Sequence, residues 1–185
     1  MKEKVSVIIP VYNSSETLNL IFSKLLNTIE KLSYDYEIIF VNDCSYDNSR
    51  EKILNIVNIN QNVIGIDLMK NYGQHNALLC GIFHAKNDLI VTIDDDLQTP
   101  PREIEKLFFK INKGYDVVYG VPNKLQHGFL RNFSSIFTKI ALRTTMGVKI
   151  AKNVSSFRVF KKSLVKSFEH YRNSYVSIDI LLKWG

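Results

Sequence analysis

LIVTIDDD (residues 89–96) joins an apolar run to three consecutive aspartates. The run predicts a buried strand over 89–93, and carboxylates crowded at its end repel one another and raise one another's pKa. We therefore expect a cation there. On extended backbone, Asp94, Asp96 and Gln98 would project to the same side. Two carboxylates and an amide oxygen suit a hard divalent ion such as Mg2+ or Mn2+; a solvated acidic loop is the alternative.

Strand and helix patterns alternate on both sides of this stretch. Short runs rich in β-branched residues predict further strands at 5–9, 36–41, 63–69 and 116–120. Apolar residues recur at helical spacing over 15–31, 49–58 and 74–85, and again after the pair Pro100 and Pro101, which suits the first turn of a helix. Strands that alternate with helices predict an α/β fold with a mainly parallel sheet and helices on both faces.

After Gly120 the pattern changes. We expect a loop at 121–128, a helix that carries an apolar stripe from Phe133 to Ala141, an irregular stretch at 146–155, a short strand at 157–160 and two helices after it. Arg131, Ser135 and Lys139 follow at four-residue steps along one face of the predicted helix. An arginine on such a face suits planar recognition of a phosphate, and a solvated surface cation is the alternative.

Polar residues follow four of the predicted strands. They are Tyr12-Asn13, Asn42-Asp43, Lys70-Asn71 and the aspartates 94–96. Ligands of open α/β sheets bind beyond the carboxyl ends of the strands. An aspartate there can accept a hydrogen bond from a base N–H or a ribose hydroxyl, although Asn42 and Asp43 taken alone also suit a capped turn. Four polar ends at one edge predict a binding site.

The composition is that of an ordinary globular domain. The chain has 185 residues, 45% of them hydrophobic, and a net charge of +6, so one domain is expected. The basic excess could serve phosphate groups, an anionic membrane surface or solubility. No aromatic-and-basic repeat points to nucleic acid. Cys44 and Cys80 have no pairing pattern and predict free thiols in a reducing compartment. No apolar stretch has the length of a transmembrane helix.

Five stretches carry a resemblance to a known family. They are VSVIIPVYN (5–13), VNDCSYDNS (41–49), NYGQHNALLCGI (71–82), DDDLQTPP (94–101) and SSFRVFKKS (155–163). In this order they resemble the nucleotide-sugar glycosyltransferases of family two, which have the Rossmann-like GT-A fold. DDDLQ followed by two prolines is most similar to the subgroup that transfers sugars to polyprenyl phosphate, the dolichol-phosphate mannose synthase type.

The resemblance implies an inverting, metal-dependent transfer from a nucleoside diphosphate sugar to polyprenyl phosphate, and it assigns residues to each part of the site. The donor is assigned to Pro10, Tyr12, Asn13, Asn42, Asp43, Lys70, Gly73, Asp94 and Asp95. The metal, Mg2+ or Mn2+, is assigned to Asp94, Asp96 and Gln98. The acceptor phosphate is assigned to Arg131, Ser135 and Arg158. Residues 1–120 then form a nucleotide-binding half and 121–185 an acceptor-side half, truncated if the native chain continues.

The acceptor decides which catalytic groups are needed besides Asp96. A phosphate monoester is already anionic, and Arg131 is then the catalytic cation. A sugar hydroxyl needs a positioned carboxylate base, for which Asp179 is the downstream candidate; a solvent-facing surface residue is the alternative for Asp179, as a structural ion pair is for Arg158. The rival functions are a soluble transferase that acts on a glycan hydroxyl and a nucleotide-binding module without turnover.

The sequence departs from the family pattern at several positions. Ser14 and Ser15 precede Glu16 where the family has acidic residues sooner, and Cys44 replaces the usual glycine after Asp43. Lys152 and Asn153 occupy a region where an acidic residue is common. The polyprenyl-phosphate enzymes often continue into membrane helices, which this sequence lacks. We expect a cytoplasmic protein, at the inner face of the membrane if its acceptor is a lipid. The base, the sugar and the oligomeric state stay open.

Overall fold

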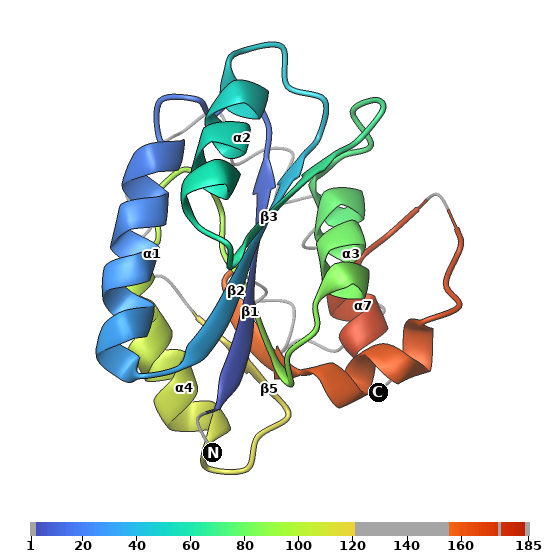
Figure 1. Ribbon diagram of the computed structural model, residues 1–185. Helices are drawn as coiled ribbons and strands as arrows, with labels where there is room; N and C mark the ends of the chain where they lie inside the picture. The colour runs from blue at the N-terminus through green and yellow to red at the C-terminus, as the bar shows by residue number, and fades with distance from the viewer. Residues whose placement is uncertain (1–2, 121–155, 174, 184–185) are drawn as a thin grey trace, which may run out of the picture.

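A six-stranded sheet lies at the centre of the protein, in the order β3-β2-β1-β4-β6-β5 (Figure 1). The computed structural model describes residues 3–120, 156–173 and 175–183. The strands are β1 (Lys4–Val11), β2 (Asp35–Asn42), β3 (Val63–Asp67), β4 (Leu89–Thr92), β5 (Val117–Tyr119) and β6 (Arg158–Lys161). The first four strands are parallel, and β6 runs antiparallel between β4 and β5. The predicted α/β class with a mainly parallel sheet is confirmed.

Helices connect the strands much as the apolar spacing predicts. They are α1 (Leu18–Leu32), α2 (Ser49–Ile59), α3 (Gln74–His84), α4 (Ile104–Ile111) and α7 (Ile178–Leu182), with 3-10 helices η1 (Pro101–Glu103) and η2 (Lys162–Phe168). Helix α1 begins three residues later than expected. The N–H and hydroxyl of Thr17 both donate to the carbonyl of Ser14 at 3.0 Å, which makes a turn ahead of the helix.

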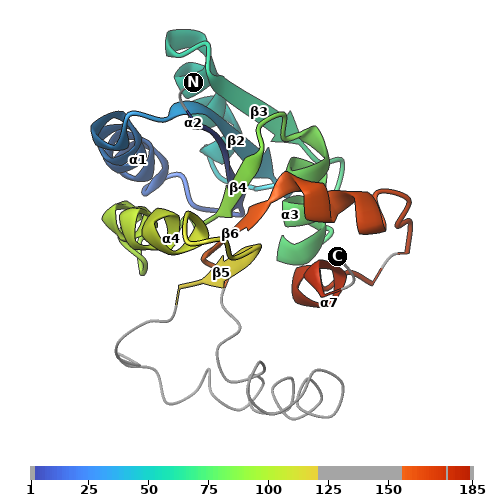
Figure 2. The same cartoon turned by 90° about the horizontal axis from the view of Figure 1, so that it is seen from below.

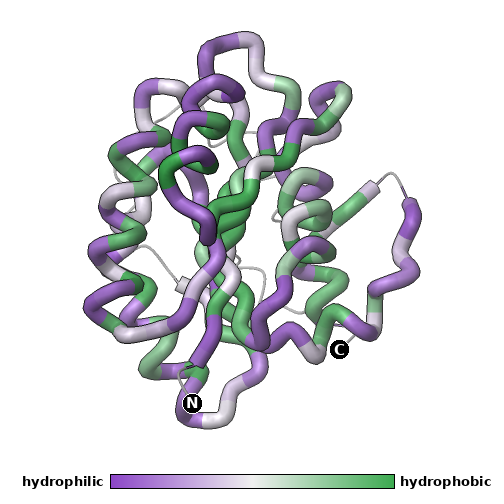
Figure 3. Tube along the Cα trace, viewed as in Figure 1, coloured by the Kyte–Doolittle hydropathy of each residue, from purple (hydrophilic) through white to green (hydrophobic). Residues whose placement is uncertain are grey.

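The helices cover both faces of the sheet and divide the core into two layers. Seen from below, α1 and α4 lie on one side and α3 and α7 on the other (Figure 2). Successive residues of a strand point to opposite faces, so Val7 and Ile9 of β1 pack in the first layer and Ile8 in the second. Figure 3 shows the hydrophobic residues gathered along these central strands.

Helix α3 lies unusually close to β1. A Cβ atom on Gly81 would come within 2.4 Å of Cγ2 of Ile8 and within 3.2 Å of Cγ2 of Val41. Since real Cβ atoms do not approach side chains that closely, the absence of a side chain at Gly81 permits this packing. The close approach packs the last turns of α3 (Gln74–His84) directly against β1 and β2.

The C-terminal segment returns to the sheet through β6. The short strand expected at 157–160 is present as Arg158–Lys161, and two helical segments follow it as predicted. The expectations for 121–155, including the apolar stripe from Phe133, Arg131 and Ser135, fall outside the described residues. Within the described part of the chain, no helix is both long enough and apolar enough to cross a bilayer.

Candidate active site

The carboxyl ends of β1, β2 and β4 meet at a cleft of about 380 Å³. The cleft is lined by Pro10, Val11, Tyr12, Asp43, Asn71, Gly73, Gln74, Asp94, Asp95 and Asp96. Strand β1 lies between β2 and β4. The chain runs from β1 to β2 on one side and from β4 to β5 on the other, and α/β folds bind ligands at such a switch point. The structure therefore brings together Pro10, Tyr12, Asp43, Gly73 and the three aspartates, as the sequence predicts.

Hydrogen bonds between loops fix the β1 side of the cleft. The N–H of Asn13 donates to Oγ of Ser45 at 3.0 Å, and the N–H of Tyr46 donates to Oδ1 of Asn13 at 2.8 Å. One step further along, the N–H of Ser14 donates to Oγ of Ser49 at 3.1 Å. The loops after β1 and β2 thus form one connected wall.

Asp43 joins this wall to the loop before α3. Its side chain is 3% exposed, and its two oxygens accept the N–H groups of Tyr72 and Gly73 at 2.7 and 2.8 Å. Each carboxylate oxygen can accept a second hydrogen bond, so Asp43 can hold the loop and still face a ligand. Cys44, which follows it, has φ +57°. That left-handed backbone explains why glycine suits this position and why cysteine adopts it under strain.

The aspartates do not follow the extended alternation expected of them. Strand β4 ends at Thr92, the chain turns at Asp95 and Asp96, and Leu97 has φ +59°. The N–H of Gln98 then donates to Oδ1 of Asp96 at 3.0 Å. The prediction that Asp94, Asp96 and Gln98 share one side of a strand is wrong in its geometry, because the strand is shorter than its apolar run. The assignment of these residues to a metal stays a prediction.

The charges at this strand end are unfavourable without a cation. Burial raises the pKa of Asp94, and so does the charge of Asp96, against the opposing effect of its hydrogen-bond donors. Burial also raises the pKa of Asp95, with a smaller contribution from the charge of Asp94. The N–H of Tyr12 donates to Oδ2 of Asp95 at 3.4 Å. Crowded carboxylates of this kind suit a divalent ion.

Three predicted donor-site residues have other contacts. The amide of Asn42 donates to Oδ1 of Asp67 at 2.8 Å and accepts from the N–H of Ser45. Nζ of Lys70 lies 4.9 Å from the centroid of the Tyr72 ring, an exposed cation–π contact. Oδ1 of Asn13 accepts the N–H of Tyr46. Their roles in ligand binding stay predictions.

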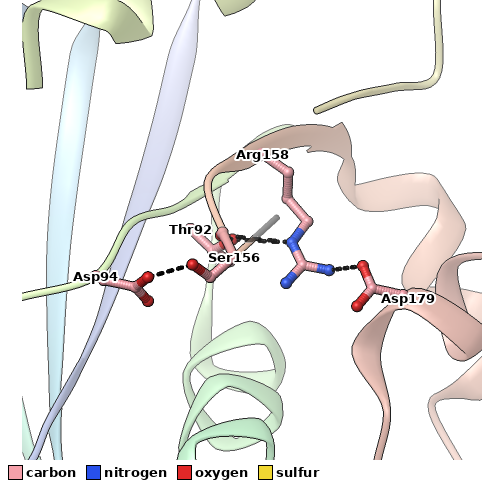
Figure 4. A network of polar contacts seen from close by, with 5 residues as sticks. All are labelled: Thr92, Asp94, Ser156, Arg158 and Asp179. Carbon is pink, nitrogen blue, oxygen red and sulfur yellow. Dashed lines mark hydrogen bonds and ion pairs between the residues drawn. The ribbon is translucent and has the colours of Figure 1, made fainter. Parts of the chain in front are cut away.

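Arg158 and Asp179 form a buried ion pair. Nη1 of Arg158 contacts Oδ1 of Asp179, and the two side chains are 1% and 4% exposed (Figure 4). The guanidinium also lies 5.6 Å from the centroid of the Tyr119 ring. Burial and the charge of Asp179 raise the pKa of Tyr119 to about 12, which keeps the phenol neutral. The ion pair that the sequence left open for Arg158 is present, whereas Asp179 is not solvent-facing.

This pairing bears on two predicted roles. Asp179 is buried, and its Oδ1 is already engaged by Nη1 of Arg158, which argues against its contact with a hydroxyl acceptor as a base. Arg158 already has a carboxylate partner and is closed to solvent, which argues against direct contact with an acceptor phosphate. Arg131 and Ser135, the other acceptor-site residues, lie outside the described part of the chain.

Comparison with known proteins identifies the family. Residues 6–169 match the pattern described as Glycosyl transferase family 2. The chain belongs to this family. Solved structures with similar folds include S. aureus TarS 1-349 in complex with UDP-GlcNAc, with a TM-score of 0.60 and 22% identity over 94% of this chain and 49% of that one. Mannosyl-3-phosphoglycerate synthase from Rubrobacter xylanophilus has a TM-score of 0.67 and 16% identity over 89% and 56% of the two chains.

A third structure contains a metal ion. Glucosyl-3-phosphoglycerate synthase from Mycobacterium tuberculosis, in complex with Mn2+, UDP and phosphoglyceric acid, has a TM-score of 0.62 and 18% identity over 89% of this chain and 58% of that one. The present chain spans about half the length of these solved structures. At these identities the likeness shows the GT-A-like fold, in agreement with the family.

The donor set of this family 2 chain fits an open metal site. Among the described residues, no group of three or more histidine, cysteine or acidic side chains is placed so that it could hold a metal ion. Four carboxylates, those of Asp43 and the aspartates 94–96, nevertheless line one cleft. Mg2+ and Mn2+ sites of nucleotide enzymes use one or two carboxylates and leave the other positions to water and phosphates. The residues present therefore fit a metal that a diphosphate completes.

Sequence reasoning missed two residues that contact Asp94. Nε2 of Gln74 donates to Oδ1 of Asp94 at 2.6 Å, and the hydroxyl of Ser156 donates to Oδ2. Both belong to stretches that carry the family resemblance, which was the available signal. Their partner lies 20 and 62 residues away along the chain, so no local spacing could connect them to it.

Proposed function

We propose that this chain binds a nucleoside diphosphate sugar and transfers the sugar, with inversion, to polyprenyl phosphate. The observation that carries the proposal is the convergence of Tyr12, Asp43 and the aspartates 94–96 in one cleft at the switch point of the sheet. Family membership supports the reaction class, and the bound UDP-GlcNAc and Mn2+ of solved structures with the same fold support the donor and the metal.

Each part of the cleft has a proposed task. Tyr12 and Asp43 hold the nucleoside, with the Tyr12 ring offering a face and the carboxylate accepting from a base or ribose. Asp94 and Asp96 would hold the divalent ion with the diphosphate. When bound, the ion stabilises negative charge on the leaving diphosphate. The bond from the anomeric carbon to the diphosphate breaks, and an acceptor oxygen forms the new bond on the opposite face.

The residues proposed for the acceptor site are assigned from the sequence alone. Arg131 and Ser135 are proposed to receive the acceptor phosphate, because they share a helix face in the predicted helix and resemble the family's acceptor positions. An acceptor phosphate is already anionic and needs no base, which agrees with the engagement of Asp179 by Arg158. We place the reaction in the cytoplasm, at the inner face of the membrane that would hold the lipid.

The test measures release of nucleoside diphosphate from UDP-, GDP- and dTDP-sugars with Mn2+, with and without a short-chain polyprenyl phosphate. Release that depends on the lipid supports the proposal. Release that requires a soluble oligosaccharide instead favours the glycan acceptor. Binding of a nucleotide, read as a rise in melting temperature, without release from any donor would favour a binding module.

A substitution at Asp96 tests the assignment of the metal ligands. Asp96→Asn should weaken Mn2+-dependent binding of the nucleoside diphosphate by at least about tenfold, because a carboxylate ligand becomes a neutral amide. Asp116→Asn is the matched control: Asp116 is exposed and pairs with Lys161 at 2.8 Å, at the end of the sheet where β4 begins, opposite the cleft. Equal affinities in the two variants, titrated calorimetrically, would refute the assignment.

A further inference from the structure

Both carboxylate oxygens of Asp94 accept hydrogen bonds from neutral side chains. Gln74, at the start of α3, donates to Oδ1 at 2.6 Å. Ser156, two residues before β6 begins at Arg158, donates its hydroxyl to Oδ2, as Figure 4 shows. Two donors on opposite oxygens leave the carboxylate little freedom to rotate. By contrast, Asp96 is exposed and accepts the backbone N–H of Gln98 within its own turn.

Ser156 is itself fixed by buried partners. Its carbonyl oxygen accepts the hydroxyl of Thr92, the last residue of β4. Nε of Arg158 donates to Oγ1 of Thr92 at 3.2 Å and lies 3.5 Å from the carbonyl oxygen of Ser156. The other side of the guanidinium is held by Asp179 of α7. Thr92, Arg158 and Asp179 are all less than 5% exposed.

The contacts form one path from α7 to the cleft. Asp179 orients Arg158, Arg158 and Thr92 fix the backbone of Ser156, and Ser156 points its hydroxyl at Asp94 (Figure 4). Partners that hydrogen-bond a metal-ligating carboxylate orient it, and their loss typically weakens metal binding by about 10- to 100-fold. A buried ion pair beside such a ligand therefore has a use beyond packing.

We propose that Ser156 is a positioning residue that sets the orientation of Asp94 toward the metal, and that the Arg158–Asp179 pair holds Ser156 in place. The inference rests on the proposed function, because it gives Asp94 the role of a metal ligand. It assigns Asp179 to support of the donor side of the site, in place of the base role predicted from the sequence.

Two matched variants isolate the hydroxyl. Ser156→Thr keeps a hydroxyl and adds a methyl group, whereas Ser156→Val has nearly the same shape as the threonine without the hydroxyl. Ser156→Ala removes the hydroxyl without adding bulk. Ser167→Ala is the control for loss of a serine hydrogen bond, since Oγ of Ser167 donates to the carbonyl of Leu164 at 2.7 Å within the exposed part of η2.

The readout is Mn2+ affinity, measured by the loss of the free-ion signal in electron paramagnetic resonance, together with the urea midpoint of each variant. We expect Ser156→Ala and Ser156→Val to bind Mn2+ about tenfold more weakly than wild type. Ser156→Thr and Ser167→Ala should stay within about twofold of it. A merely structural serine would shift the urea midpoint and leave Mn2+ affinity unchanged.

The outcomes separate this inference from the proposed function. Equal Mn2+ affinity in Ser156→Ala and Ser167→Ala, in a wild type that binds Mn2+ and releases nucleoside diphosphate, overturns the inference alone. A wild type that neither binds Mn2+ nor turns over a donor overturns the proposed function and the inference with it. If Ser156→Ala does not fold, the comparison of the threonine and valine variants decides, and equal affinities there overturn the inference.

Discussion

Replacing Asp179 by asparagine should lower the free energy of unfolding by about 3 kcal/mol, at the lower end of what removing one partner of a buried ion pair costs. The guanidinium of Arg158 is 1% exposed and would lose its anionic partner. Two of its other acceptors are the Thr92 hydroxyl at 3.2 Å and the Ser156 carbonyl at 3.5 Å, both neutral. The asparagine keeps the shape and one acceptor oxygen, so the loss reflects charge.

Urea denaturation of wild type and Asp179→Asn measures the effect. Asp116→Asn is the control, because its pair with Lys161 has side chains 41% and 66% exposed, and surface pairs contribute about 0–1 kcal/mol. A double variant that removes both charges, Arg158→Met with Asp179→Leu, should recover much of the loss, since well-packed apolar residues often replace a buried pair at little cost.

A loss in Asp179→Asn no larger than in Asp116→Asn would refute the buried pair. The kinetics distinguish the two roles considered for Asp179. If the variant keeps its stability and its affinity for the donor but loses kcat by several orders of magnitude, Asp179 acts as a base. If stability and Mn2+ affinity fall together and turnover recovers at high Mn2+, Asp179 acts through Arg158 and Ser156.

Two further predictions concern the loop after β2. Cys44 has φ +57°, so the free energy of unfolding of Cys44→Val should be about 1–2 kcal/mol lower than that of Cys44→Gly. Urea denaturation of the two variants measures this difference. A valine variant as stable as the glycine variant would contradict the strained backbone. Burial would raise the pKa of Asp47, but hydrogen bonds from Ser49 and Ser15 outweigh it and lower that pKa from 3.8 to about 2. The stabilisation is therefore present above pH 4 and is lost as the pH falls toward 2. The stability difference between wild type and Asp47→Asn should shrink over that range, and a difference that stays constant would speak against it.

The sheet and its helices could be predicted because apolar periodicity reports burial directly. Val7, Ile8 and Ile9 are buried on alternate faces of β1, which a continuous apolar run between helical segments already indicates. The convergence of strand ends follows from parallel topology alone. Tyr12 and Asp43 could therefore be placed at one cleft without any knowledge of side-chain orientation.

The details of the acidic turn could not be predicted, because they depend on where the strand stops. Ile93 continues the apolar run but not β4, and Leu97 adopts a left-handed backbone that its side chain does not favour. Alternation fails after such a turn. The ion-pair partner of Arg158 could not be predicted either, since Asp179 is 21 residues away and reaches Arg158 only when α7 returns to the sheet.

The two sides of the cleft are held in different ways, and this suggests how the site is stabilised. On the nucleoside side, several loops share hydrogen bonds with Asp43 and Asn13, so the loss of one bond leaves others in place. On the metal side, Gln74 and Ser156 donate hydrogen bonds to Asp94, and Ser156 depends in turn on the buried pair. A substitution in that pair should therefore affect metal binding more than nucleoside binding. Donor binding with and without Mn2+ in Asp179→Asn would measure this asymmetry, and equal losses in both conditions would contradict it.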